Sequence, residues 1–238
     1  MLPPGGRVPV ARRHARRVAA GRRATGEPVP MIELETDPPE RVDGRAARAE
    51  RTRAAIVEAH LALIDSGDLR PTGERIAERA GVSLRTLWTN FKDMETLFAA
   101  TGRRVGERQA TLWQPVSPEL PLTARIAAFC DQRARLLEVL APSARASALR
   151  EPFSPQLRRN REAAIARVRQ EIESVFGAEL AHAGPGREQL LDALTVAGTW
   201  SAWSMMRDSM GLDVDAARAV MARTLGALLV DAIAAGLR

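Results

Sequence analysis

The sequence predicts an all-α protein, and three observations support that prediction. Apolar residues recur three and four positions apart over much of the chain, which is the spacing of one buried helical face. Clusters of Pro and Gly divide the chain into segments of helical length. No segment sustains the apolar–polar alternation of a half-buried strand. The 238 residues suffice for one large domain or two small ones, and they include no run of about 18 apolar residues that would cross a membrane.

A first helix is expected over residues 46–66, with Gly67 as its stop signal. The residues of its buried face follow the i, i+3, i+4, i+7 spacing: Ile56, Ala59, His60, Leu63 and Ile64. Such a face needs a partner, so further helices should pack against it.

Two short helices should follow the first. Thr72 is placed to cap one that ends near Ala80, and Ser83 is placed to cap the other after the turn residue Gly81. A longer helix is expected over 93–112, because acidic residues at its start suit the positive end of the helix dipole.

A cluster of prolines then predicts a domain boundary: Pro115, Pro118 and Pro121. Pro142 is expected to end one helix and to start another short segment. The helices expected in this second part cover 122–140, 156–181, 187–210 and 214–235.

The chain is therefore divided into a disordered tail (1–44), a first helical domain (45–110) and a larger second one (111–238). Residues 1–30 carry seven Arg and one acid, 7 − 1 = +6, which equals the net charge of the whole chain. The tail admits three interpretations: a basic arm that grips phosphates, a transit peptide, or an over-extended annotation with the true start at Met31. The Pro and Gly content speaks against the transit peptide.

Composition argues against an enzyme. The single cysteine, Cys130, predicts no internal disulfide and fits a reducing compartment. Glu179 and His182 have the spacing of di-iron bundles, but such sites need two such pairs and further glutamates. No phosphate-binding loop, dinucleotide, metalloprotease or nucleophile-elbow motif occurs. We therefore expect no catalytic residues, no metal and no cofactor.

The last two expected helices are poor in charge. No residue from Ala193 to Met206 is charged, and Asp231 is the one charged residue from Thr224 to Gly236. A helix that is apolar on most of its circumference must bury most of it. The region about 187–235 is thus expected to pair with a second copy of the chain, the alternative being two core helices of a monomer.

Residues 72–91 carry the functional signal, with the sequence TGERIAERAGVSLRTLWTNF. Two short helices joined by a tight turn containing Gly fit the helix-turn-helix pattern. The segment closely resembles the DNA-binding region of the tetracycline-repressor (TetR) family of bacterial regulators over about residues 48–100. The matching positions are Thr72, Ile76, Ala77, Ala80, Gly81, Val82, Ser83, Thr86, Leu87, Trp88 and Phe91.

Three positions depart from the family pattern. Trp88 replaces the usual Tyr, and Asn90 replaces the usual Tyr or His before Phe91. The family Lys that touches phosphate corresponds to Met94 here, while Lys92 lies two residues earlier. Whether Lys92 takes over that contact is left open by the sequence.

The resemblance implies a role for each matched residue on double-stranded DNA. Residues implied to hold phosphate or sugar are Thr72, Ser83, Trp88 and Asn90, with Lys92 beside them. Residues implied to face base edges are Arg85, Thr86 and Thr89. Arg51 and Arg53 are expected to meet the DNA backbone. The alternative for Arg85 is a solvated surface residue or a phosphate clamp.

The resemblance also implies a homodimer that reads a palindromic operator and holds a small-molecule effector in its C-terminal domain. Candidate pocket residues, each alternatively plain core, are Trp113, Phe129, Phe153, Phe176, Trp200 and Trp203. The expectation is a cytoplasmic, nucleoid-associated repressor released from DNA by its ligand. The alternative is a helical dimeric interaction protein without an effector or with lost DNA binding.

Overall fold

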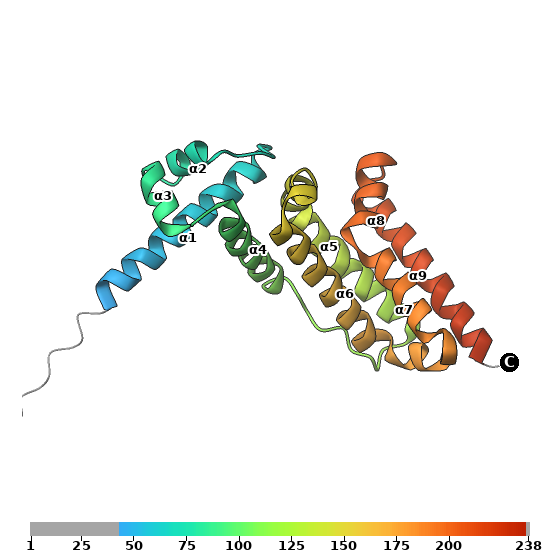
Figure 1. Cartoon of the computed structure of the whole chain (residues 1–238). Helices are drawn as coiled ribbons and strands as arrows, with labels where there is room; N and C mark the ends of the chain where they lie inside the picture. The colour runs from blue at the N-terminus through green and yellow to red at the C-terminus, as the bar shows by residue number, and fades with distance from the viewer. Residues whose placement is uncertain (1–42, 237–238) are drawn as a thin grey trace, which may run out of the picture. The chain divides into compact units, whose positions relative to one another are not determined.

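The computed structural model describes residues 43–236, which form helices and connecting turns without any strand. The all-α prediction is confirmed for this part of the chain. The first four helices are α1 (Asp43–Asp65), α2 (Gly73–Arg79), α3 (Leu84–Asn90) and α4 (Met94–Ala110), as Figure 1 shows. The tail interpretations concern residues outside the described range, except that α1 already begins at Asp43.

The predicted caps fix the starts of the short helices. The Thr72 hydroxyl accepts the N–H of Arg75 at 3.4 Å, and the Ser83 hydroxyl accepts the N–H of Thr86 at 3.0 Å. Gly81 between them has φ +67°, a left-handed conformation that favours glycine. These local interactions determine the turn between α2 and α3.

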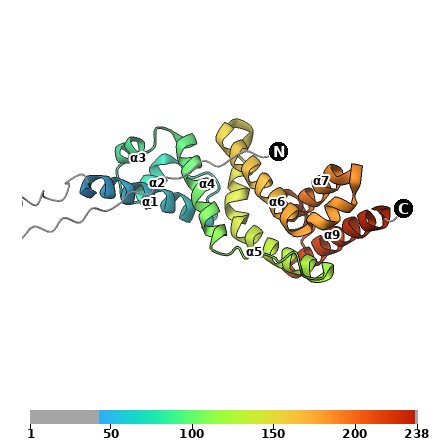
Figure 2. The same ribbon diagram turned by 90° about the horizontal axis from the view of Figure 1, so that it is seen from below.

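The remaining helices pack as a second group. They are α5 (Leu122–Ala148), a 3-10 turn (Glu151–Phe153), α6 (Pro155–His182), a second 3-10 turn (Gly184–Gly186), α7 (Arg187–Gly198), α8 (Trp200–Ser204), a π-helical turn (Met205–Ser209) and α9 (Val214–Gly236). Helix α9 contacts α5, α6 and α7, and Figure 2 shows these four helices side by side. No helix among the described residues is long and apolar enough to cross a membrane.

The expected break at Pro142 is wrong, because α5 continues through it to Ala148. A proline inside a helix removes one hydrogen bond and costs about 3 kcal/mol. Ala141 and Ala146 are buried on either side of Pro142, and Leu140 packs against both hydrophobic cores of the protein. Tertiary packing on both sides therefore outweighs the local penalty.

The expected helix over 187–210 is interrupted at Thr199, which is extended with φ −86° and ψ 163°. The carbonyl of the preceding Gly198 instead accepts two hydrogen bonds from the buried Arg133 guanidinium, at 2.9 and 3.2 Å. A side chain at Gly198 would also approach Val168 to 3.2 Å. The break is thus held by contacts with other helices, which no local sequence pattern reveals.

Two hydrophobic cores organise these helices. The first, among α1 to α4, includes Ile56, Leu61 and Leu97, and the second, among α5 to α9, includes Phe129 and Leu225. All five residues of the predicted α1 face are buried. The division at residues 110 and 111 remains a prediction, since residues 43–236 pack as one compact unit.

Candidate functional site

Helices α2 and α3 form a helix-turn-helix on the first core. Ile76 and Ala77 of α2, Leu87 of α3 and Phe91 just after it are all buried, as their spacing predicts. The side chains that anchor α3 are therefore on one face, and the remaining face is available to solvent. This arrangement suits a helix that enters the major groove of DNA.

Gly73 is a residue of this motif that the sequence reasoning missed. A Cβ placed on Gly73 would lie 2.6 Å from Cζ2 of Trp88 and 3.3 Å from Cδ1 of Leu84. The Trp88 ring thus lies against the backbone at the start of α2, with 37% of its surface exposed. The sequence signal for this contact is Gly73 directly after the helix cap Thr72, because a glycine there allows another chain segment to approach the backbone closely.

The polar residues of α3 are organised by hydrogen bonds within the helix. The Thr89 hydroxyl donates to the Arg85 carbonyl at 2.8 Å, and the Asn90 amide donates to the Thr86 carbonyl at 2.8 Å. The hydroxyls of Ser83 and Thr86 lie 2.8 Å apart. Asn90 retains one free amide N–H, and Arg85 keeps all its donors, since it is exposed and forms no ion pair among the described residues.

Cations near α3 and at the start of α1 lack acidic partners within the described part of the chain. These are Arg45, Arg48, Arg51, Arg85 and Lys92, all of them exposed. In contrast, Arg104 and Arg108 of α4 are paired with Glu58 of α1. Unpaired exposed cations raise the local positive potential, which favours a polyanion such as DNA.

Arg53, which is expected to meet the DNA backbone, also makes contacts within the protein. Its guanidinium donates to the carbonyl of Asn90 and lies 4.3 Å from the centre of the Phe91 ring. These contacts join α1 to the end of α3. Arg53 therefore positions the candidate recognition helix in the structure, while Arg51 stays exposed.

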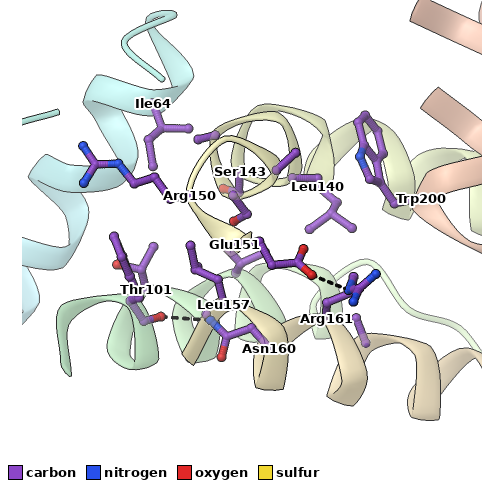
Figure 3. A pocket seen from close by; sticks show the side chains of 18 of the residues that line it. Ile64, Thr101, Leu140, Ser143, Arg150, Glu151, Leu157, Asn160, Arg161 and Trp200 are labelled. Atoms are coloured by element: carbon purple, nitrogen blue, oxygen red, sulfur yellow. Dashed lines mark hydrogen bonds and ion pairs between the residues drawn. The ribbon is translucent and has the colours of Figure 1, made fainter. Parts of the chain in front are cut away.

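A cavity of about 370 Å³ lies between α1, α4, α5, α6 and α8. Figure 3 shows Arg150 beside Ile64 of α1, and Trp200 at the other side of the view. Of the six candidate pocket residues, Trp200 lines this cavity. Phe129, Phe176 and Trp203 are completely buried in the second core. The other two are exposed and do not line it: Trp113 (48%) and Phe153 (87%).

The polar lining of this cavity was not anticipated. His60 Nδ1 lies 2.9 Å from the Thr101 hydroxyl, and both residues are buried. Burial first, and then the charge of Arg150, lower the pKa of His60 to about 4. Asn160 of α6 donates to the Phe98 carbonyl of α4 at 3.1 Å, over Gly102, where a Cβ would lie 2.6 Å from its Nδ2. These polar residues come from helices far apart in sequence, so no single motif contains them.

The helices expected to pair with a second copy present apolar residues to solvent. Val196 of α7 is 65% exposed and Val230 of α9 is 60% exposed. Val220 of α9 and Met205, which follows α8, are exposed as well. Their neighbours Leu225 and Leu229 are buried in the second core, so α9 has one face in the core and an outer face on which the exposed valines lie beside the exposed Arg223.

Glu179 and His182 do not form a metal site. Glu179 is buried in an ion pair with Arg125, with distances of 2.6 and 2.9 Å. Burial is the largest influence and by itself would raise the pKa of Glu179. The hydrogen bonds and charge of Arg125, a backbone hydrogen bond and the nearby His182 together outweigh burial and leave the pKa below its ordinary value. Within the described residues, no group of three or more His, Cys, Asp or Glu side chains could hold a metal ion.

Two solved structures resemble this arrangement of helices. A transcriptional regulator from Rhodococcus sp. Rha1 has a TM-score of 0.57 at 20% identity, over 77% of this chain and 96% of that chain. A protein described as a TetR-family transcriptional regulator from Mesorhizobium loti has a TM-score of 0.52 at 19% identity, over 79% of this chain and 97% of that one. The chain has a TetR-type fold.

The TetR-type fold agrees with the resemblance of residues 48–100 to the TetR family. No protein-family model matches the sequence, and no curated protein matches it. At about 20% identity, a shared TetR-type fold leaves the activity to be argued from this chain's own residues.

Proposed function

We propose that the protein is a transcriptional regulator that binds double-stranded DNA through α3. The observation that carries the proposal is the outward face of α3, where Arg85 has no ion partner among the described residues. Thr86 and Thr89 lie on the same helix as Arg85, and their hydroxyl groups can form hydrogen bonds with the edges of more than one base. The buried anchors Leu87 and Phe91 hold this face rigidly, which lowers the entropic cost of docking.

Within this proposal the residues divide into two groups. Arg85, Thr86 and Thr89 meet base edges, and Arg85 can form a forked pair with the O6 and N7 atoms of guanine. Groups that meet phosphate or sugar are Thr72, Ser83, Trp88, Asn90 and Lys92, with the exposed cations at the start of α1. Lys92 lies beside Asp93 but is exposed and forms no ion pair among the described residues, so it can take the phosphate contact that Met94 cannot make.

We further propose a homodimer that pairs through α7 and α9 and reads a palindrome with half-sites about one helical turn apart. The exposed Val196 and Val230 support this surface. A repressor that leaves its operator when a small molecule binds is the regulatory mode that we propose. It requires a ligand with different affinity for the DNA-bound and free states, worth about 1–3 kcal/mol of coupling.

The test is selection of bound fragments from the source genome in vitro at moderate salt, followed by sequencing. An enriched palindrome is expected, and the Arg85→Ala variant should lose about 1–3 kcal/mol on that site while its non-specific binding changes little. Arg135→Ala on the exposed side of α5 is the matched control and should bind like the wild type. No enrichment from a folded dimer would refute specific DNA binding and favour a helical interaction protein.

A further inference from the structure

The cavity beside α1 and α4 joins the two hydrophobic cores. Ile64 and Val105 line it from the first group of helices, and Leu157 and Trp200 line it from the second. Leu140, also in the lining, packs against both cores. At about 370 Å³ its volume lies at the lower end of the ~300–1,000 Å³ range of ligand pockets. An occupant would therefore contact the helices of both groups at once.

The lining carries excess positive charge. Its ionised side chains are three arginines, Arg150, Arg161 and Arg167, and one acid, Glu151, which gives +3 − 1 = +2. Glu151 lies 2.7 Å from Arg161 and neutralises it. His60 adds no charge near neutral pH, because burial and the nearby Arg150 lower its pKa to about 4. The excess charge thus belongs to Arg150 and Arg167.

Of these two arginines, Arg150 is half-buried and Arg167 is exposed. The groups around Arg150 only partly replace the hydration that its guanidinium loses on burial. Its guanidinium donates to the Pro71 carbonyl at 3.4 Å and lies 6.0 Å from the centre of the Phe98 ring. Pro71 and Phe98 themselves line the cavity. It forms no ion pair within the described residues. A half-buried guanidinium with one long hydrogen bond is stabilised when an anion accepts a shorter, charge-assisted hydrogen bond from it.

We propose that this cavity binds a small amphiphile with one anionic head, of the class of medium-chain alkyl carboxylates. The head pairs with Arg150 at the α1 side of the cavity, and the alkyl chain extends along Leu140 and Leu157 toward Trp200. The apolar walls account for the chain, and the uncompensated guanidinium accounts for the charge.

Arg150 also connects the ligand to the helix-turn-helix. Its partner Pro71 directly precedes Thr72, whose side chain caps α2. A carboxylate that draws the guanidinium toward itself lengthens the 3.4 Å hydrogen bond to the Pro71 carbonyl, so the anchor of the segment that starts α2 weakens. This consequence for DNA affinity rests on the proposed function, whereas the binding of the ligand does not.

The experiment is titration calorimetry of the full chain without DNA, with octanoate, 1-octanol and octylamine as probes of equal chain length. Octanoate is expected to bind at least about 10-fold more tightly than either of the others, which equals about 1.4 kcal/mol. Arg150→Gln should abolish the preference for octanoate over 1-octanol. Arg150→Lys, which keeps the charge, should retain part of it, and Arg135→Gln on the exposed side of α5 should retain all of it.

Three results would overturn the proposal: 1-octanol or octylamine binding as tightly as octanoate, a folded Arg150→Gln protein that keeps the preference, or no binding of any probe. The two proposals fail separately. A protein that selects an operator but ignores octanoate refutes the ligand class alone, and one that binds octanoate through Arg150 but selects no DNA refutes the proposed function alone.

Discussion

The contact between Gly73 and Trp88 allows a sharp test of how the helix-turn-helix is built. In Gly73→Ala, the new methyl group would lie 2.6 Å from Cζ2 of Trp88, whereas ordinary carbon contacts are 3.4–4 Å. The indole ring must therefore move by about 1 Å, or α2 and α3 must separate by a similar distance. Either movement displaces Trp88, a proposed phosphate contact.

Two opposing effects determine how much Gly73→Ala changes the free energy of unfolding. Replacing a helical glycine by alanine stabilises a helix by up to about 1 kcal/mol. Overpacking costs about 1–3 kcal/mol, and less where a ring can move into solvent, as the 37% exposed Trp88 can in part. We expect Gly73→Ala to lower the free energy of unfolding by about 1 kcal/mol. Gly106→Ala in α4 is the control, because nothing lies within 4 Å of its Cβ, and it should raise that free energy by about 0.5–1 kcal/mol.

Urea unfolding of the two variants measures both terms, and a double-mutant cycle assigns the cause. When Trp88→Ala removes the ring, adding Gly73→Ala should become stabilising, as Gly106→Ala is. The reasoning is refuted if Gly73→Ala alone stabilises the protein, or if its cost persists without the ring.

Three further predictions follow from the buried groups and the exposed faces. His60 has a pKa of about 4 in the folded protein against 6.5 as its ordinary value, so the unfolded chain binds more protons between these pH values. Acidification from pH 6.5 to 4 should thus cost about 3 kcal/mol of stability at this residue, and urea titrations should show a shallower pH dependence for His60→Asn. Arg125→Ala leaves the buried Glu179 carboxylate unpaired and should lower the free energy of unfolding by about 3–5 kcal/mol. Arg135→Ala, on the exposed side of α5, is the control and should change that free energy by less than about 0.5 kcal/mol. Equal losses in the two variants would contradict a stabilising role for the Arg125–Glu179 ion pair. Val230→Glu places a charge on the outward face of α9 and should convert the proposed dimer to a folded monomer. Size-exclusion chromatography with light scattering measures the mass of the particle. A dimer that persists would show that the interface lies elsewhere.

The helix-turn-helix was predictable because its signals are local. A capping hydroxyl at Thr72 or Ser83 acts on a backbone N–H three residues away, and Gly81 adopts its left-handed conformation within a single turn. The apolar spacing of α1 likewise needs only one helix. These interactions depend on neighbours in the sequence, so the sequence shows them directly.

The cavity was not predictable in the same way. Aromatic residues were the natural candidates for its walls, but Phe129 and Phe176 pack against each other with ring centres 5.5 Å apart and fill the second core. Arg150 and His60, 90 positions apart in the sequence, line it instead. Which large side chain fills the interior and which cation faces a hollow depends on how the helices pack.

By itself the sequence determined the helical class, the ends of the short helices and the residues of α3 that face outward. It did so because hydrogen-bond caps, turn residues and apolar spacing act within about ten residues. Only the tertiary structure decided that α5 passes through Pro142, that α7 ends at Gly198, and that Arg53 holds α3. In each of these cases contacts between distant helices decide the outcome, and at Pro142 they outweigh a local penalty of about 3 kcal/mol. Only the packed chain brings those contacts together.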